Sequence, residues 1–218
     1  MLTFELFDLK HTLAEKYLES FTYPWQALAG IKNFILALGG TLKKDYEEVL
    51  NGVWVHKSAA VAKSAYLGAP CIIGEGAEVR HCAYIRGSAL VGAGCVVGNS
   101  TELKNVILFD GVQVPHYNYV GDSILGYKAH MGAGAITSNV KSDKSKVEIR
   151  IEGKTFETGL KKCGAMLGDG VEVGCGSVLN PGTVIGKNTI IYPLSGVRGY
   201  VPPDSIYKSA GNVCAKHT

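Results

Sequence analysis

The stretch CIIGEGAEVRHCAYIRGSALVGAGCVVG, residues 71–98, repeats a simple pattern every six residues. A large apolar residue recurs at this interval, with a small residue two positions before it and often a glycine directly after it. The apolar series comprises Val55, Val61, Leu67, Ile73, Val79, Ile85, Val91, Val97, Leu103 and Phe109. It resumes later as Leu167, Val173, Leu179, Ile185, Ile191 and Val197, and Leu125 and Met131 form a short bridge. So many matches in one phase indicate an internal repeat.

The period of six predicts a coil of short parallel strands. It excludes an amphipathic helix, since residues six apart fall on opposite faces of a helix with 3.6 residues per turn. Antiparallel hairpins are also excluded, because strands of three residues cannot reverse so often. In stacked coils, each aliphatic side chain points inward, the small residue fits beside a corner, and glycine permits the corner backbone. The 28 glycines among 218 residues meet this need, and the sequence therefore predicts an all-β parallel β-helix.

The ends of the chain lie outside the repeat. Residues 1–50 lack the period and contain two segments, 9–20 and 24–38, that are typical of helices. Because a solenoid needs its first coil covered, we interpret residues 1–50 as a short helical N-terminal cap. Residues 51–208 then form the β-helix, and residues 209–218 form a C-terminal tail.

Two further breaks interrupt the repeat. Residues 138–163 are an insertion in which Val147, Ile149 and Ile151 alternate with other residues before a Glu-Gly turn, which predicts an extruded hairpin. The insertion is rich in lysine and would suit a phosphorylated ligand, and a solvated charged loop is the alternative. The other break is a slip of register around residues 115–125. Because local rules tend to fail at functional sites, we look for chemistry at these two breaks, and we expect them to place His116 and the lysine-rich insertion close together on one edge of the β-helix.

The composition excludes several classes of protein. A formal net charge of +3 gives no reason to expect nucleic acid or a membrane surface as a partner. The sequence has no run of about eighteen apolar residues, and its acidic N-terminus does not resemble a signal peptide. The six cysteines form no Cys-x-x-Cys pair, so we expect reduced thiols in a cytoplasmic protein. Cys71 and Cys95 occupy small inward positions, where we expect them to act as buried apolar residues.

Among the histidines, His116 has the most suggestive surroundings, because it lies in the slipped segment beside Tyr117 and Tyr119. An imidazole with a reference pKa of about 6.5 suits proton transfer near neutral pH. The residues alone leave a surface or structural role open as the alternative. A metal site is not expected, since His116 and His130 have no carboxylate or cysteine at ligand spacing.

Three motifs between residues 98 and 139 give the chain a specific resemblance. They are Gly98-Asn99 with Glu102-Leu103-Lys104, His116-x-x-Tyr119-Val120-Gly121-Asp122, and Gly132-Ala133-Gly134-Ala135-Ile136-Thr137-Ser138-Asn139. Their order and spacing resemble the acetyltransferase domain of the bacterial bifunctional enzyme that makes UDP-N-acetylglucosamine, a member of the hexapeptide-repeat acyltransferase superfamily. The resemblance implies a single-stranded left-handed β-helix, a homotrimer, and acetyl-CoA as co-substrate without a metal.

The resemblance also implies roles for individual residues. His116 falls on the base that takes a proton from the sugar amine, so that the amine can attack the thioester of acetyl-CoA. Arg86 and Lys104 fall on positions that hold the sugar phosphate. The sugar-contacting positions of the family correspond to Tyr119, His130 and Asn139, with His130 in place of an asparagine.

For the cofactor, Ala133 and Cys175 fall along the groove that takes the pantetheine arm, and Lys208 falls near a CoA phosphate. Residues 158–165 and 180–183, with the longer hairpin, resemble the C-terminal regions of archaeal-type sugar-1-phosphate nucleotidyltransferases. In those relatives a nucleotidyltransferase domain precedes the solenoid. The segment before this solenoid is too short for one, so we do not expect the chain to form a sugar nucleotide by itself.

These observations lead to three hypotheses about function. The first, which we take as the prediction, is an acetyl-CoA-dependent N-acetyltransferase acting on an amino-sugar phosphate similar to glucosamine-1-phosphate. It would act as a homotrimer with sites between protomers. The second is a non-catalytic trimerisation or ligand-binding module that associates with a separate sugar nucleotidyltransferase. The third is an acyltransferase that acts on a nucleotide-linked amino sugar.

Overall fold

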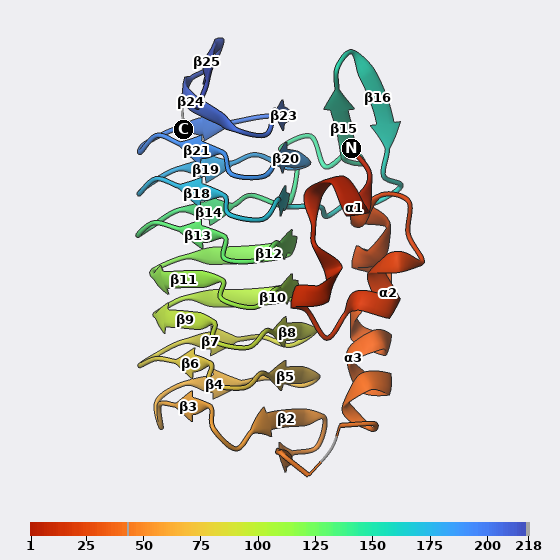
Figure 1. The fold of residues 1–218 in the computed structure, drawn as a ribbon, viewed down its shortest axis with the longest axis vertical. Helices are drawn as coiled ribbons and strands as arrows, with labels where there is room; N and C mark the ends of the chain where they lie inside the picture. The colour runs from red at the N-terminus through yellow and green to blue at the C-terminus, as the bar shows by residue number, and fades with distance from the viewer. Residues whose placement is uncertain (43, 217–218) are drawn as a thin grey trace.

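The computed structural model describes residues 1–42 and 44–216. Its main body is a left-handed parallel β-helix whose coils stack along the long axis of the molecule (Figure 1). The short strands are parallel from coil to coil, as the repeat predicts, and their columns form three faces. The inward aliphatic residues of the stretch that opens the sequence analysis, Ile73, Val79, Ile85, Val91 and Val97, are all buried. Burying one such side chain contributes about 1.5–3 kcal/mol, so the stack is the main source of stability.

Each face takes one strand from each coil. The first face contains β2 (Val53–His56), β5 (Cys71–Ile73), β8 (Ala89–Val91), the second halves of β10 (Glu102–Leu108) and β12 (Tyr119–Leu125), β17 (Ala165–Leu167), β20 (Thr183–Ile185) and β23 (Tyr200–Val201). The second face contains β3 (Ala60–Val61), β6 (Glu78–Val79), β9 (Val96–Asn99), β11 (Gln113–His116), β13 (His130–Met131), β18 (Glu172–Val173), β21 (Ile190–Ile191) and β24 (Ser205–Ser209). The third face contains β4 (Tyr66–Leu67), β7 (Tyr84–Ile85), the first halves of β10 and β12, β14 (Ile136–Thr137), β19 (Val178–Leu179) and β22 (Gly196–Val197).

The edge between the third and first faces, here called the 3/1 edge, absorbs the irregularities of the repeat. β10 and β12 run around this edge without a break and turn at Asn105 and Asp122, whose φ angles are 54° and 48°. Asparagine and aspartate tolerate this left-handed conformation better than most residues. Cys71 pairs with Ala89, whereas Ala89 pairs with Val106, one residue sooner than a regular coil would give. The same shortening recurs at Asp122.

The structure therefore has two register slips: the one at Asp122 lies within the predicted residues 115–125, and a further one, at Asn105, precedes them. Leu108, not Phe109, pairs with Val91 and continues the inward series. Phe109 is buried as well, and its ring lies 5.0 Å from that of Phe7. Because residues 108 and 109 are both large and apolar, the period alone could not distinguish them.

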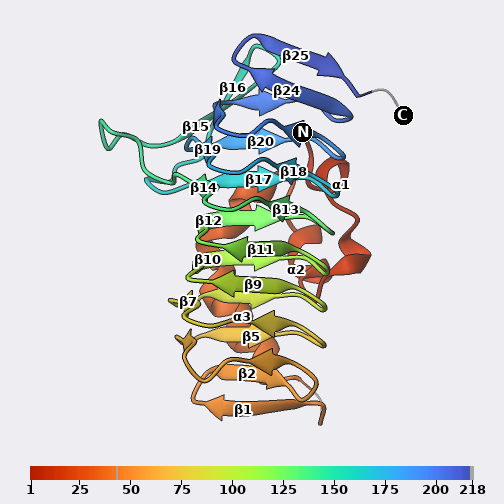
Figure 2. The ribbon, with the colours of Figure 1, turned by 90° about the vertical axis from the view of Figure 1, so that its left-hand side faces the viewer.

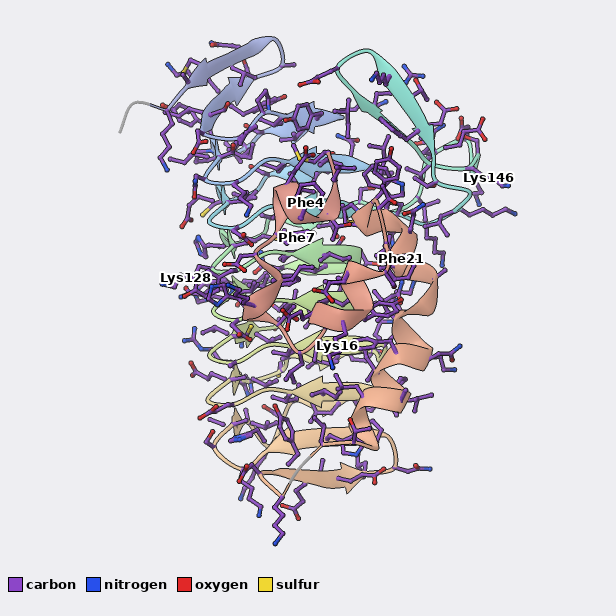
Figure 3. All side chains as sticks on the ribbon, turned by 45° about the vertical axis from the view of Figure 1, so that its right-hand side comes forward. Phe4, Phe7, Lys16, Phe21, Lys128 and Lys146 are labelled. Atoms are coloured by element: carbon purple, nitrogen blue, oxygen red, sulfur yellow. The ribbon has the colours of Figure 1, made fainter. Side chains whose placement is uncertain are left out.

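The long insertion leaves the coil at the same 3/1 edge, between β14 and β17 (Figure 2). It contains the predicted hairpin, in which β15 (Glu148–Ile151) pairs antiparallel with β16 (Lys154–Glu157). Lys146 extends from this loop away from the coils, whereas Phe7 lies between the N-terminal segment and the coils (Figure 3). The hairpin prediction is confirmed.

The N-terminal segment lies with its helices along the first face, and of the predicted cap, residues 1–50, only the strand at residues 46–50 covers the end of the first coil (Figure 1). It comprises α1 (Thr3–Leu6), η1 (Leu9–His11), α2 (Glu15–Glu19), η2 (Pro24–Gly30) and α3 (Ile31–Gly39). α3 contacts β5, β8 and β10, and η2 contacts β12. Within the described part of the chain, no helix has the length and apolar character that crossing a membrane requires.

The physical reason for this placement is an apolar outer surface on the first face. The outward residues of its central strands are fully buried, namely Ile72, Leu90, Ile107, Ile124, Met166 and Val184. Left in water, this row would expose a large apolar patch, so it binds the helical segment. Below the first coil lies β1 (Tyr46–Leu50), which pairs antiparallel with β2.

The C-terminal end also differs from the predicted tail. β25 (Asn212–Ala215) folds back and pairs antiparallel with β24. This pairing occupies the hydrogen-bonding groups of the last strand of the second face, which an open edge would leave unpaired. The structure therefore ends in a hairpin.

The cysteines agree with a reduced chain. All six are free, and Cys71, Cys95 and Cys163 are buried. Burial raises the pKa of each of these three thiols to about 12, so they stay protonated and unreactive. The prediction that Cys71 and Cys95 act as small buried apolar residues is confirmed.

We expect Leu90→Ala to lower the free energy of unfolding by about 2–5 kcal/mol, because it opens a cavity between the first face and α3. Val96→Ala is the matched control, since Val96 is half-buried and points outward from the second face, on which none of the described helices packs. Urea unfolding followed by circular dichroism measures both changes. Equal losses for the two variants would contradict the packing of α3 on this face.

Candidate active site

Four of the predicted site residues gather on the third face and its 3/1 edge. Arg86 follows β7, and its Nη1 donates to Oε1 of Glu102 at 2.9 Å. Glu102 lies directly beside Tyr119 in the sheet register. Lys104 and Asn139 lie at the edge itself, on coils below and above Tyr119. The coil register therefore brings together residues that are far apart in the sequence.

Asp122 is the centre of this group, and its side chain is only 7% exposed. Lys104 Nζ lies 2.9 and 3.1 Å from its two carboxylate oxygens. Nδ2 of Asn105 donates to Oδ1 at 3.0 Å, and Nδ2 of Asn139 donates to Oδ2 at 2.5 Å. A buried carboxylate needs such partners to offset its lost hydration. The network fixes Lys104 and Asn139, and Asn105 also donates to the Leu28 carbonyl of the N-terminal segment at 3.1 Å.

The Tyr119 side chain packs directly against the backbone of Gly121, where any larger residue would clash with it. A Cβ atom on Gly121 would lie 2.5 Å from the Tyr119 hydroxyl oxygen, so Gly121 makes room for this side chain. The hydroxyl oxygen accepts a hydrogen bond from Nδ2 of Asn139 at 3.2 Å. Burial, together with the charge of Asp122, raises the pKa of Tyr119 above its usual value. The hydroxyl keeps its proton and can donate it to a ligand.

His116 lies at the other border of the third face, the edge between the second and third faces, here called the 2/3 edge. Its backbone N–H donates to Oδ1 of Asn118, and its carbonyl accepts from the Gly134 N–H, both at 3.0 Å. Asn118 is itself buried and donates to the Gly132 and Ala135 carbonyls. The backbone is thus fixed while the imidazole is exposed, with no hydrogen-bond partner among residues 1–42 and 44–216.

The predicted cofactor residues continue the 2/3 edge above His116. The Gly176 N–H donates to the Ala133 carbonyl, and the Leu194 N–H donates to the Cys175 carbonyl, both at 2.8 Å. Ala133 and Cys175 are exposed and are flanked by glycines, so this part of the edge carries little side-chain bulk. Lys208, which follows the pairing of Ile191 with Tyr207, lies at the top of the same edge.

His130 does not join the Tyr119–Asn139 group within one chain. It lies on the second face, where its Nδ1 is 2.7 Å from Oε2 of Glu172. Across the residues that the structure describes, no three His, Cys, Asp or Glu side chains gather in a way that could hold a metal ion.

The structure corrects one spatial expectation. His116 and the lysine-rich insertion were expected close together, because both interrupt the repeat. They lie on opposite edges of the third face, since His116 follows β11 of the second face and the insertion follows β14 of the third. Sequence reasoning also missed the central roles of Asp122 and Asn105. The sequence signal for this network was the pair Lys104-Asn105, followed one coil later by Gly121-Asp122.

We expect Asp122→Ala to lower the free energy of unfolding by about 3 kcal/mol, because Lys104, Asn105 and Asn139 would all lose their acceptor. Glu102→Ala is the control, since the Glu102–Arg86 pair is largely exposed and such surface pairs contribute little to stability. Thermal and urea unfolding measure both variants. A loss for Asp122→Ala no larger than the control's would contradict a buried network.

Comparison with known proteins identifies relatives for this architecture. Residues 69–190 match the family model described as the GMPPB C-terminal domain. A bifunctional sugar-1-phosphate nucleotidylyltransferase/acetyltransferase of Sulfurisphaera tokodaii is 30% identical over 90 residues, 41% of this chain and 22% of that protein. The bifunctional protein GlmU of Methanococcus maripaludis is 34% identical over 88 residues, 40% of this chain and 21% of that protein. The chain thus spans about a fifth of the length of these relatives.

Among solved structures, a hexapeptide transferase family protein from Anaplasma phagocytophilum matches with a TM-score of 0.43 and 16% sequence identity. The match covers 77% of this chain and 81% of that one.

Proposed function

The chain belongs to the GMPPB C-terminal domain family, and on that premise we propose that it is an acetyl-CoA-dependent N-acetyltransferase. Its acceptor is an amino sugar that carries a phosphate, of the kind found in glucosamine-1-phosphate. The single observation that carries this proposal is the arrangement of polar side chains around the third face. An exposed histidine lies on one edge of this face, and a hydrogen-bonded group of polar side chains that could bind a sugar lies on the other. The partial similarity to two bifunctional enzymes supports it.

In the proposed reaction, His116 is the general base. The unprotonated imidazole nitrogen accepts a proton from the sugar amine while the amine nitrogen attacks the thioester carbonyl of acetyl-CoA. A C–N bond forms, the C–S bond breaks, and the CoA sulfur leaves as a thiolate that takes up a proton. The exposure of His116 and its fixed backbone suit this role, because the ring is accessible to a substrate while hydrogen bonds hold the backbone of the residue in place.

The acceptor lies across the third face in this proposal. The Tyr119 hydroxyl donates to the sugar, since its oxygen already accepts from Asn139. Arg86 and Lys104 face the acceptor phosphate, and Glu102 and Asp122 orient them. The pantetheine arm of acetyl-CoA lies along the 2/3 edge, where the small residues at 133 and 175 leave room, with Lys208 near the CoA phosphates.

Assembly is part of the proposal. The first face is covered by the chain's own helices, whereas the third face and the 2/3 edge carry exposed apolar side chains, namely Tyr66, Tyr84, Tyr117, Val178, Tyr192 and Leu194. A homotrimer would bury this surface. Since His130 lies on a different face from Tyr119 in one chain, it can join the sugar site only from a neighbouring protomer.

The test of the activity uses free-thiol release from acetyl-CoA with glucosamine-1-phosphate, galactosamine-1-phosphate and a nucleotide-linked amino sugar. We expect turnover with at least one acceptor and a loss of about 10²–10⁴-fold in kcat for His116→Ala. His81→Ala is the matched control, because His81 is an exposed histidine lower on the same edge. No thiol release with any acceptor, together with intact assembly, would favour a non-catalytic module instead.

The test of assembly uses Leu194, which is 85% exposed although its φ of 57° disfavours a leucine. We expect Leu194→Asp to shift the protein from trimer towards monomer, because it places a charge in the proposed interface. Leu36→Asp on α3 is the control, since Leu36 is also exposed but lies over the first face. Sedimentation velocity measures both variants, and an unchanged trimer with Leu194→Asp would rule out this interface.

A further inference from the structure

A cleft of about 440 Å³ lies between the long insertion and the 3/1 edge. The beginning of the insertion, strand β15 and the last two turns of this edge form its walls. Figure 2 shows the insertion standing out from the coils beside β14 and β19. This volume falls in the range of small-molecule sites, about 300–1,000 Å³, and the roles proposed above use none of the cleft's charged side chains.

The cleft has a surplus of positive charge. Arg150 lies 3.3 Å from Glu148, and Lys141 lies 3.8 Å from Asp143. Arg198 makes no ion pair or side-chain hydrogen bond within the part of the chain that the structure describes. One guanidinium therefore faces the cleft without a protein anion. Arginine presents paired N–H donors that match phosphate geometry.

The outer wall of the cleft is held in place. Ile149 and Ile151 of β15 are buried, so the alternation of the strand turns Glu148 and Arg150 to the opposite, cleft side. A Cβ atom on Gly182 would lie within 3.2 Å of both Val147 and Ile149, which means that the hairpin packs closely on this edge. Phe156 of β16 packs against Tyr23 and Trp25 of the N-terminal segment. The cleft is thus pre-formed, which lowers the cost of binding.

The coil register relates the cleft to the proposed sugar site. Arg198 occupies the same position in its coil as Lys104 does four coils lower. Coils spaced by about 4.8 Å place these cations about 19 Å apart, with Tyr119 between them and about 14 Å below Arg198. A single phosphate cannot reach both. At the lower position, Glu102 and Asp122 already neutralise Arg86 and Lys104 at 2.9 Å, so the upper position is the better place for added negative charge.

We propose that the cleft between the insertion and the 3/1 edge binds the diphosphate of a nucleoside-diphosphate-linked amino sugar. This inference rests on the proposed acetyl transfer and gives it a nucleotide-linked acceptor in place of a sugar monophosphate, with Arg86 and Lys104 beside the sugar instead of a phosphate. A sugar at Tyr119 reaches the cleft through a diphosphate linkage, and Arg198 with Arg150 binds the phosphates. Val140 and Pro181 supply apolar contacts for a nucleoside. The diphosphate of CoA has the same chemistry and is the other source that a test must separate.

The experiment measures binding by isothermal titration calorimetry, without any turnover, using UDP, GDP and coenzyme A as separate ligands. We expect a nucleoside diphosphate to bind the wild-type protein, and Arg198→Gln to weaken binding at least about tenfold. Arg150→Gln should weaken it less, because Arg150 is already shared with Glu148. Arg80→Gln, an exposed arginine on the second face paired with Glu78, is the control and should bind normally.

Two results would overturn the inference. One is the absence of UDP and GDP binding, or binding that Arg198→Gln leaves unchanged at an unaltered melting temperature. The other is Arg198-dependent binding of coenzyme A without binding of UDP or GDP, which would assign the cleft to the diphosphate of CoA. These titrations need no acetyl transfer. A failure of thiol release would therefore refute the proposed activity, while the titrations would still show whether the cleft binds a nucleoside diphosphate.

Discussion

The inward stack of aliphatic side chains is the constraint on which the rest of the structure depends. Every coil must set its apolar residues directly above those of the coil below, so the strands cannot gain or lose a residue. The edges can, because their side chains point outward and their backbone can turn through left-handed conformations. Within the described residues, the shortenings at Asn105 and Asp122 and the insertion 138–163 all lie on the 3/1 edge. The polar network around Asp122 lies where the stack permits irregularity.

The N-terminal segment adds a second constraint, because it decides which faces remain available. Its helices bury the outward residues of the first face so completely that Ile72 and Leu90, among others, are not exposed to water. It also reaches the site, since Asn105 bonds both the Leu28 carbonyl and Asp122. It holds the hairpin through the packing of Tyr23 and Trp25 on Phe156. A segment that appeared to be only a cap in the sequence therefore supports both the Asp122 network and the wall of the cleft.

The sequence was informative where one physical environment repeats. The inward series and the hairpin could be predicted because each position imposes the same demand on its residue. The grouping of Arg86, Lys104, Tyr119 and Asn139 was expected only through motif resemblance, since register across coils is not visible in composition. The placement of the helices was missed, although the outward residues of the first face are apolar in coil after coil. The earlier of the two register slips, at Asn105, was missed because Leu108 and Phe109 both suit a core.

The two edges of the third face divide the proposed chemistry between them. The 3/1 edge holds the buried Asp122 carboxylate and its hydrogen-bond network, so it suits positioning, whereas the 2/3 edge carries the exposed histidine. A base in open water gains little from its surroundings, because charge interactions are weak in a high dielectric. The exposed aromatic and aliphatic side chains beside His116 are therefore relevant to catalysis as well as to assembly. A second protomer that covers them would also exclude water from the imidazole, so that in this proposal the site is complete only in the oligomer.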